Sequence, residues 1–572
     1  MYILGISCDY HDSSAVLLQA GQLVAGASEE RFSRKKHDAG IPSRTIAWCL
    51  EHAGIQARDL DYVAFYEKPL LKFDRILATS LGYYPHSCSF FREALLSWFS
   101  EKLWIKSRLM KLLGVPADRM LFCEHHMAHA ASAFYCSGFE DAAILTVDGI
   151  GEWATATMGE GHGTEIRLPR EIRWPHSLGM LYSVFTAFLG FEVNEGEYKV
   201  MGMAPYGVPR FMDKVWKLVR VSDDGAIELD LDYFSYHRTP GRAFSSKFIA
   251  LFGEPRSPNA AGQDQRYADI AASLQNVTEE ILLRMARAAT SRSGTKRLVM
   301  AGGVALNCVA NGRIQDEAGV DELFVQPAAG DGGGALGAAL WTWHAVLGKS
   351  RVAALEHVSW GRAVSGEEIR SELERTGAAG MALQSEDDLI LRATDDLLAG
   401  EVIGWSQGRF EWGPRALGHR SILADPRRAE TRDVVNTKIK FRETFRPFAP
   451  SLPVESAVRY FDQPVACHPT ARFMLRTADV RSGMRDQIPA VTHLDGSARP
   501  HLVHRAANPL YFDLIRRFGE GSGHPVLLNT SFNLRGEPIV ASAADAISTF
   551  FRSGLDVLYL ENYRIAKREP GA

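Results

Sequence analysis

Two histidines spaced to bind one metal ion stand in a stretch of good helix formers. His125 and His129 are four residues apart, so both imidazoles lie on one helix face. Asp148 and Asp331 each follow a predicted strand in a glycine-bracketed turn and could complete the site, although either alone could be an ordinary turn carboxylate. Imidazole and carboxylate ligands together suit iron(II), manganese or zinc. His126 replaces the general-base glutamate of the zinc protease motif, which argues against a metalloprotease.

A glycine pair follows the strand expected at residues 297–300. Gly302 and Gly303 would let a nucleotide approach the backbone closely, and Asn307 and Asn311 could bond its ribose or base. The alternative is a helix start with two surface asparagines. Residues 330–334 repeat the pattern of strand, glycines and helix, which places backbone N–H groups where phosphate or ribose can bind.

Positive charge is concentrated in one part of the C-terminal third. Residues 409–446 contain ten Lys or Arg against five Asp or Glu, in a chain whose net charge is -4. This bias predicts an anion site, with a solvated basic surface as the alternative. Glycine and proline among the basic residues 413–418 favour a shaped pocket. Arginine forks match phosphate oxygens, and the candidate anion ligands are Arg415, Arg420, Lys440, Arg442, Arg446 and the distant Arg499.

Two further segments could contact substrates. Residues 528–533 supply neutral hydrogen-bonding side chains, including Asn529 and Ser531, which an uncharged polar group of a substrate would need. Residues 31–37 form a basic loop that contains Lys36. This loop could contact phosphate or a polar acceptor, or it could simply be exposed.

The elements that would position these residues include two similar strand triplets. The first comprises residues 3–7, 14–19 and 22–28, and the second comprises 142–147, 154–158 and 165–172. Repeated triplets followed by helices predict a duplicated, two-lobed α/β domain over residues 1–350. Actin- and hexokinase-type ATPases are built on this plan. Apolar periodicity predicts helices over 43–52, 92–113 and 265–290 and from about 305, and a strand over 323–326.

A second α/β unit is expected over residues 386–572. It begins with a predicted helix at 388–398 and a strand at 401–405. Residues 351–385 have mixed character and are interpreted as a linker or domain edge.

Composition narrows the class of protein. Hydrophobic residues make up 46% of the chain and charged residues 23%, which is ordinary for a soluble globular protein. The net charge does not favour nucleic acid or an acidic membrane as a partner. The cysteines are odd in number and never spaced as Cys-x-x-Cys, which fits a reducing cytosol. No basic-then-apolar leader is visible and residues 332–348 are interpreted as a buried helix, so a cytoplasmic location is expected.

Six sequence strings together resemble the O-carbamoyltransferase family of nodulation protein U and the tobramycin and cephamycin carbamoyltransferases. They occur in the family's order over nearly the whole chain: His11–Ala15, Glu29–His37, His125–Ala133, Gly196–Gly207, Gly413–Arg420 continuing to Pro450, and Asn529–Asn533. The resemblance implies an N-terminal actin-like (ASKHA) domain similar to the tRNA threonylcarbamoyl-transfer enzymes. It also implies a C-terminal domain similar to YrdC, which makes acyl adenylates.

The resemblance further implies a two-step reaction. Carbamoyl phosphate and ATP with Mg²⁺ would give carbamoyl adenylate in the C-terminal domain, and an acceptor hydroxyl would then attack it in the N-terminal cleft. His125, His129, Asp148 and Asp331 would bind an iron-type ion. Lys36 and Asp148–Ile150, with Gly149 between, would contact the adenylate. ATP and carbamoyl phosphate would be bound by Arg415, Lys440, Arg446, Arg499, Asn529 and Ser531. The acceptor would contact Asp9, His11 and Ser33. His11, beside Asp12, could take the hydroxyl proton.

Other functions fit less well. A tRNA threonylcarbamoyl-transfer enzyme would share the N-terminal plan, but the negative net charge and lack of an RNA-binding motif count against it. A hydrogenase-maturation carbamoyltransferase carries an acylphosphatase segment and cysteine zinc fingers, and neither is visible here. A non-catalytic actin-like nucleotide switch would need no basic C-terminal unit and no paired-histidine site. The expected partner is therefore a small hydroxyl acceptor, without nucleic acid or membrane, and the resemblance is compatible with a homodimer.

Overall fold

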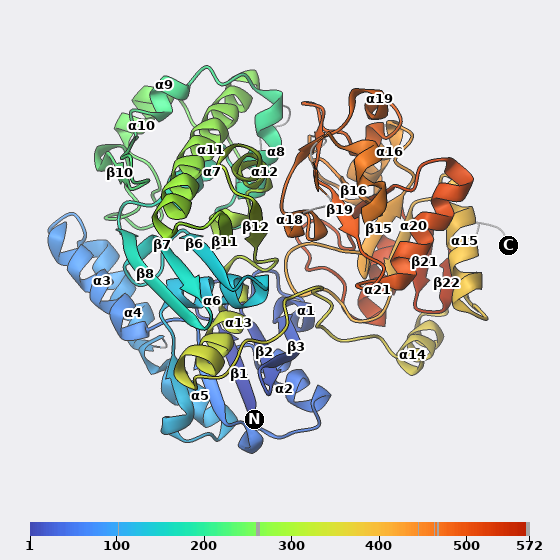
Figure 1. Ribbon diagram of the computed structural model, residues 1–572, viewed down its shortest axis with the longest axis horizontal. Helices are drawn as coiled ribbons and strands as arrows, with labels where there is room; N and C mark the ends of the chain where they lie inside the picture. Colours follow the sequence, from blue (N-terminus) through green and yellow to red (C-terminus); the bar gives the residue numbers. More distant parts are fainter. Residues whose placement is uncertain (101, 259–263, 444, 463, 466–467, 568–572) are drawn as a thin grey trace. The chain divides into compact units, whose positions relative to one another are not determined.

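The computed structural model describes residues 1–100, 102–258, 264–443, 445–462, 464–465 and 468–567. The chain divides into two compact units. The first comprises residues 1–25 and 39–355, and the second comprises residues 26–38 and 356–572. Figure 1 shows the elements of both along the chain. A short N-terminal segment therefore belongs to the unit built mainly from the C-terminal third, which residue order alone did not indicate.

The first unit contains two five-stranded sheets of the same design. Their strand orders are β3-β2-β1-β4-β5 and β8-β7-β6-β11-β12. In the first sheet β1 pairs antiparallel with β2 and parallel with β4. In the second sheet β6 pairs antiparallel with β7 and parallel with β11. The predicted duplication of an α/β lobe is therefore confirmed at the level of strand order. The strands are β1 Tyr2–Ser7, β2 Ser14–Gln19, β3 Gln22–Ser28, β4 Tyr62–Phe65, β5 Met120–Phe122, β6 Asp141–Val147, β7 Ala154–His162, β8 Glu165–Arg173, β11 Arg297–Ala301 and β12 Glu322–Val325.

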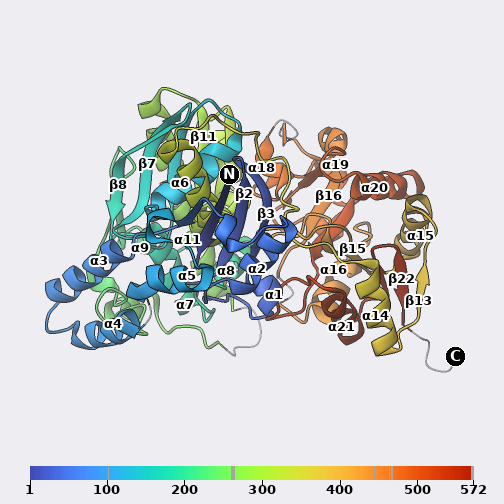
Figure 2. The same ribbon diagram turned by 90° about the horizontal axis from the view of Figure 1, so that it is seen from below.

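Two helices join these sheets. Helix α13 (Asp331–Trp341) packs on β1 and β2, helix α6 (His125–Ser137) packs on β6 and β11, and the two helices pack against each other. Figures 1 and 2 show both helices among the strands of the first unit. Helix α11 (Gln265–Ser293) covers the second sheet. The remaining helices of the unit are α2 Ser43–His52, α3 Pro69–Gly82, α4 Cys88–Ser100, α5 Ile105–Leu113, α7 Leu178–Phe188, α8 Glu197–Met203, α9 Met212–Val215, α10 Ser246–Phe252 and α12 Cys308–Glu317.

Three segments differ from the sequence-based expectation. Residues 92–113 form parts of two helices, α4 and α5, separated by a 3-10 turn at Lys102–Trp104, because apolar periodicity does not mark where a helix axis changes direction. The helix expected from residue 305 is a 3-10 turn followed by α12, which begins after Asn307. The helix expected at 332–348 ends at Trp341 and continues as a π-helical turn. None of the described helices is both long and apolar enough to cross a membrane.

The second unit is built on one eight-stranded mixed sheet with the order β13-β22-β21-β14-β15-β20-β16-β19. Residues 351–385, expected as a linker or domain edge, contain helix α14 and the edge strand β13. Two apolar clusters form the core of the unit. Its main elements are α1 Glu30–Ser33, α14 Gly366–Thr376, β13 Gly380–Ala382, α15 Glu386–Ala399, β14 Ile403–Ser406, β15 Arg420–Ala424, α16 Glu430–Val434, β16 Ala449–Pro453, β19 His501–Val503, α20 Pro509–Ser522, β20 Leu527–Ser531, α21 Ala543–Arg552, β21 Val557–Leu560 and β22 Tyr563–Ala566.

The contact between α6 and α13 requires a glycine. A Cβ added at Gly337 would lie 1.7 Å from the backbone oxygen of Ala128, so even alanine must push the helices apart. We expect Gly337→Ala to lower the free energy of unfolding by about 1–3 kcal/mol, measured by urea denaturation. Gly82→Ala, where an added Cβ meets nothing within 4 Å, is the matched control. Equal stability of the two variants would show that this close approach is not needed.

Candidate active site

The four predicted metal ligands converge in the first unit. His125 and His129 lie in the first turns of α6, Asp148 follows β6, and Asp331 begins α13. Each of the four offers one ligand atom, and these atoms all lie within 4.8 Å of one another. All four side chains are buried. Residues separated by about 200 positions thus form one compact cluster, as the sequence predicted.

The distances between ligand atoms match those around a single ion. The Nε2 atoms of the two histidines are 3.1 Å apart, and Asp148 Oδ2 lies 2.9 Å from His125 Nε2 and 3.5 Å from His129 Nε2. Asp331 Oδ1 lies 3.7 Å and 3.8 Å from the same nitrogens. With metal–ligand bonds of about 2.0–2.2 Å, ligands lie about 3.0 Å apart at right angles and about 3.4 Å apart at a tetrahedral angle. These residues could therefore hold a metal ion.

The electrostatics of the cluster also favour a cation. Burial alone would favour a neutral His125, but its hydrogen bond to Asp148 and the charge of Asp331 outweigh burial and raise its pKa to about 9. Asp331 Oδ2 is buried and has no hydrogen-bond partner among the described residues. Two buried carboxylates therefore attract positive charge at this point, and either a proton or a metal ion can supply it.

Neighbouring loops hold the ligands in place. Glu152 accepts hydrogen bonds from the backbone N–H of His125 at 3.0 and 3.1 Å, which satisfies the first turn of α6. The backbone N–H of Gly303 donates to Asp148 Oδ1 at 2.8 Å and leaves Oδ2 facing the histidines. Gly302 has a φ of 97°, and an added Cβ would lie 2.2 Å from the oxygen of Val147. The glycine pair after β11 thus positions Asp148, one of the candidate metal ligands.

The expected acceptor turn lies directly after β1. Asp9 and Asp12 have positive φ values of 69° and 54°, a conformation that aspartate tolerates better than most residues. Asp9 accepts from Arg108, and Asp12 Oδ2 lies 2.9 Å from His11 Nδ1. Burial lowers the pKa of His11, but Asp12 and the charge of Asp331 raise it to about 9. Asp331 therefore links His11 electrostatically to the candidate metal ligands.

A second centre lies in the other unit around Lys440. Its ammonium is buried and donates to the backbone oxygens of Ser531 and Asn533 at 2.8 Å and to Asn533 Oδ1 at 2.6 Å. Burial, followed by the charges of Arg442, Arg446 and Lys36, holds the pKa of Lys440 well below its usual range. Several cations close together around a buried lysine could bind a polyanion.

These two centres lie in segments that both match known families. Residues 2–340 match the carbamoyltransferase N-terminus, and residues 394–567 match the carbamoyltransferase C-terminus. The chain belongs to the carbamoyltransferase family. The enzyme is 45% identical to an uncharacterized protein of Synechocystis sp. over 99% of this chain and 97% of that protein. It is 38% identical to nodulation protein NolNO of Sinorhizobium fredii over 98% and 79% of the two chains. It is 35% identical to the 3'-hydroxymethylcephem-O-carbamoyltransferase of Amycolatopsis lactamdurans over 74% and 76%.

Some predicted ligands of this carbamoyltransferase have internal partners instead. Arg420 is fully buried, and its guanidinium donates to the backbone oxygens of Gln407, Gly408 and His419 at 2.9–3.0 Å. It therefore braces the loops beside β15, which differs from the expected contact with phosphate. Composition could not distinguish a buried arginine from one that lines a pocket.

The two asparagines expected to bind nucleotide also have internal roles. Asn307 Oδ1 accepts from the backbone N–H of Ala310 as the cap of α12, and its Nδ2 donates to Gln275. Asn311 Nδ2 donates to the oxygen of Ala305, and the side chain is fully buried. Both asparagines therefore serve packing of the first unit of the carbamoyltransferase.

The remaining predicted residues divide between the two units. Gly149 and Ile150 belong to the turn that follows Asp148, and the oxygen of Gly149 accepts from Ser177 Oγ at 2.7 Å. Arg415 and Arg499 are partly buried in the second unit. Ser33 and Lys36 also belong to that unit, whereas Asp9 and His11 belong to the first.

One carboxylate that sequence reasoning missed shapes the cationic loop. Glu411 is fully buried, and its Oε1 accepts from the backbone N–H groups of Leu417, His419 and Arg420 at 2.7–3.2 Å. It thereby organises the loop that carries Arg415. In the sequence Glu411 is an acidic residue inside a basic stretch, and a count of charges does not single it out.

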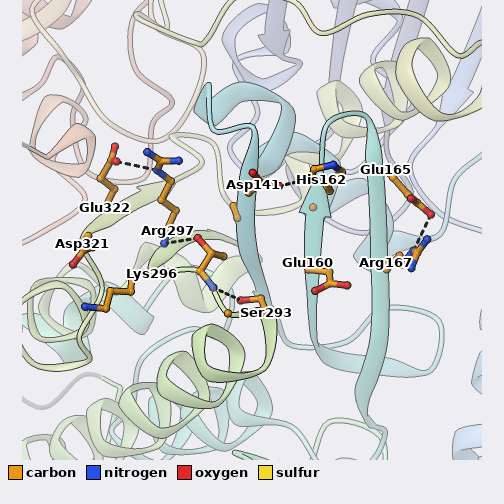
Figure 3. A pocket seen from close by; sticks show the side chains of 14 residues that line it. Asp141, Glu160, His162, Glu165, Arg167, Ser293, Lys296, Arg297, Asp321 and Glu322 are labelled. Carbon is orange, nitrogen blue, oxygen red and sulfur yellow. Dashed lines mark hydrogen bonds and ion pairs between the residues drawn. The ribbon is translucent and has the colours of Figure 1, made fainter.

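The enzyme also has a polar pocket of about 760 Å³ at the edge of the second sheet that lies away from the candidate metal ligands (Figure 3). Its charged groups pair with one another, as in Arg297–Glu322 at 3.0 Å and Arg167–Glu165 at 2.8 Å. Asp141, at its rim, begins β6, whereas Asp148 follows the end of that strand about 20 Å away. Ligands of α/β sheets usually bind beyond the carboxyl ends of strands, which is where the candidate metal ligands lie.

Proposed function

We propose that this enzyme is an ATP-dependent O-carbamoyltransferase that makes carbamoyl adenylate before it transfers the carbamoyl group. One observation carries the proposal: each unit contains its own buried polar centre, and the chemistry of the two centres differs. The centre of the second unit is cationic, whereas the centre of the first is a set of metal ligands. Activation of anionic substrates requires a cationic centre, and transfer of the carbamoyl group requires a centre of different chemistry.

The first step would occur at the Lys440 centre. Water cleaves carbamoyl phosphate to carbamate and phosphate, and a carbamate oxygen then attacks the α-phosphorus of ATP·Mg²⁺. A new O–P bond forms, the bond to the β-phosphate oxygen breaks, and pyrophosphate leaves. Lys440, Arg442, Arg446 and Lys36 supply the positive charge that offsets the phosphates, and Ser531 and Asn533 hold Lys440 in position. Arg415 and Arg499 are further candidate ligands.

The second step would occur at the histidine–aspartate centre. The acceptor hydroxyl oxygen attacks the carbamoyl carbon of the adenylate, the carbamoyl–phosphate oxygen bond breaks, and AMP leaves. His125, His129, Asp148 and Asp331 would hold iron(II), manganese or zinc, which would supply Lewis-acid polarisation and offset developing negative charge. His11, oriented by Asp12, would take the hydroxyl proton. A cation held by the four candidate metal ligands would offset the negative charge of Asp148 and Asp331 and would thereby lower the pKa of His11.

The acceptor in this proposal is a hydroxyl group of a small molecule. The name of the Amycolatopsis relative indicates O-carbamoylation of a hydroxymethyl group, which supports an alcohol acceptor here. A location in the cytoplasm, where ATP and carbamoyl phosphate are available, is part of the same proposal.

Pyrophosphate release without any acceptor tests the proposal. We expect purified enzyme with ATP, Mg²⁺ and carbamoyl phosphate to release one pyrophosphate and one phosphate per adenylate formed. Mass spectrometry of the quenched mixture should detect carbamoyl adenylate. Omission of either ATP or carbamoyl phosphate should abolish pyrophosphate release. Phosphate release with no consumption of ATP would contradict an adenylate mechanism.

A further inference from the structure

Ser359 and His419 form a short hydrogen bond beside a small cavity of the second unit. Ser359 Oγ lies 2.6 Å from His419 Nε2. Both residues line a cavity of about 30 Å³, and Asn508 lines it with them. A hydroxyl within hydrogen-bond reach of an imidazole is the arrangement that nucleophilic catalysis by serine requires. The proposed carbamoyl transfer uses none of these three residues.

The backbone fixes the tautomer of His419. Its Nδ1 lies 3.1 Å from the carbonyl oxygen of Gln407, which can only accept, so Nδ1 carries the ring proton. Burial lowers the pKa of the imidazole and outweighs the opposing charge of Glu411, so the ring is neutral at pH 7. The lone pair of Nε2 therefore accepts the hydroxyl proton of Ser359, as the lone pair of a general base must.

A buried carboxylate would stabilise the charge that His419 gains with a second proton. Glu411 is fully buried, and its Oε1 accepts from the backbone N–H of His419 at 2.9 Å. Its negative charge acts to raise the pKa of His419, which means that it favours the imidazolium. A buried aspartate has this role in the serine hydrolases.

Asn508 offers an N–H donor at the same point. As the N-cap of α20 its Oδ1 accepts from the backbone N–H of Tyr511 at 3.2 Å, which fixes the orientation of the amide. Its Nδ2 donates to the oxygen of Gly418 at 3.3 Å and lies 3.2 Å from His419 Nε2. Nε2 has one lone pair, which the shorter contact with Ser359 occupies. The second N–H of Asn508 can therefore bond an oxygen that develops negative charge beside Ser359 Oγ.

We propose that the second unit hydrolyses activated esters of small acyl groups, with Ser359 as nucleophile, His419 as base and Asn508 as oxyanion donor. Ser359 Oγ attacks the carbonyl carbon, and its proton passes to His419 Nε2. The bond to the leaving oxygen breaks, and that oxygen takes the proton from His419. Water then attacks the acyl-serine and gives its proton to His419, which returns it to Ser359 Oγ as the carboxylic acid leaves. The cavity has room for about two water-sized groups, which suits formyl or acetyl.

A fluorophosphonate probe tests the nucleophile directly. Attack of Ser359 Oγ on phosphorus forms an O–P bond and expels fluoride, and His419 takes the hydroxyl proton. We expect mass spectrometry of the digested full-length enzyme to find the adduct on Ser359. The rate constant of labelling should fall by at least about 10²-fold in His419→Asn. Ser497→Ala is the matched control, because Ser497 Oγ lies 3.1 Å from His493 Nδ1 but neither residue lines the cavity.

Release of p-nitrophenol from p-nitrophenyl acetate tests turnover. We expect Ser359→Ala to reduce the rate to that of buffer alone, whereas Ser497→Ala keeps the wild-type rate. Asn508→Asp should lower kcat/KM by about 10²-fold, because aspartate retains the helix cap but has no N–H to donate. Circular dichroism identifies any variant that does not fold.

Three results would overturn the inference. They are a phosphonate adduct on other residues only, equal labelling of wild type and His419→Asn, and unchanged ester hydrolysis in Ser359→Ala. The position of the adduct is measured on the wild-type enzyme, so it decides the matter even if a variant fails to fold.

Discussion

In the Arg446→Ala variant, pyrophosphate release from ATP and carbamoyl phosphate falls by about 10³-fold, because the variant lacks a cation beside the phosphates. Arg446 is close enough to Lys440 for its charge to lower the pKa of the buried ammonium. The two cations repel each other in the free enzyme, so a bound polyanion gains from both. Arg446→Lys should recover part of the rate, because it restores the charge without the bidentate fork.

The control for this experiment is an exposed arginine, because Arg446 is only 20% exposed and is itself 3.9 Å from Glu443. Arg516 lies on α20, is 55% exposed and pairs with Glu520 and Asp513. Arg516→Ala should retain the wild-type rate, since an exposed ion pair contributes little. Steady-state assays at several ATP concentrations will distinguish lost binding from lost turnover. Equal rates for Arg446→Ala and Arg516→Ala would remove the Lys440 centre as the site of activation.

The second large effect concerns transfer to the acceptor. His129→Ala should abolish carbamoyl transfer, by at least about 10³-fold, while acceptor-independent pyrophosphate release stays within about twofold of wild type. His129 lies in the first unit with the other three candidate metal ligands, whereas the Lys440 centre lies in the second. Elemental analysis after metal loading should find about one ion per wild-type chain and a clear loss in the variant.

His162→Ala is the matched histidine control. His162 ends β7 and its side chain is 78% exposed, so its replacement should change neither metal content nor transfer. If His129→Ala and Arg446→Ala reduce pyrophosphate release equally, the division of labour between the two centres is wrong. Normal metal content in His129→Ala would exclude that residue as a ligand even if transfer is lost.

Much of the fold was predictable because local patterns carried it. The strands at 14–19 and 22–28 and the helix at 43–52 were predicted with their observed bounds, since polar turns and apolar periodicity define them. Periodicity failed at 92–113 and after residue 303, where helices change axis or begin as 3-10 turns. The grouping of residues 26–38 with the C-terminal part depends on long-range packing and has no local signal.

The sequence by itself determined the ligand types and their spacing: two histidines on one helix face, aspartates after strands, and a basic segment rich in glycine and proline. Only the tertiary structure decided which of these residues meet. It turned Asn307, Asn311 and Arg420 toward internal partners, and it oriented Asn529 through Ala416, Ser451 and His501. The physical reason is that residue type sets what a side chain can bond, whereas burial and the geometry of distant backbone groups decide which of those bonds it makes.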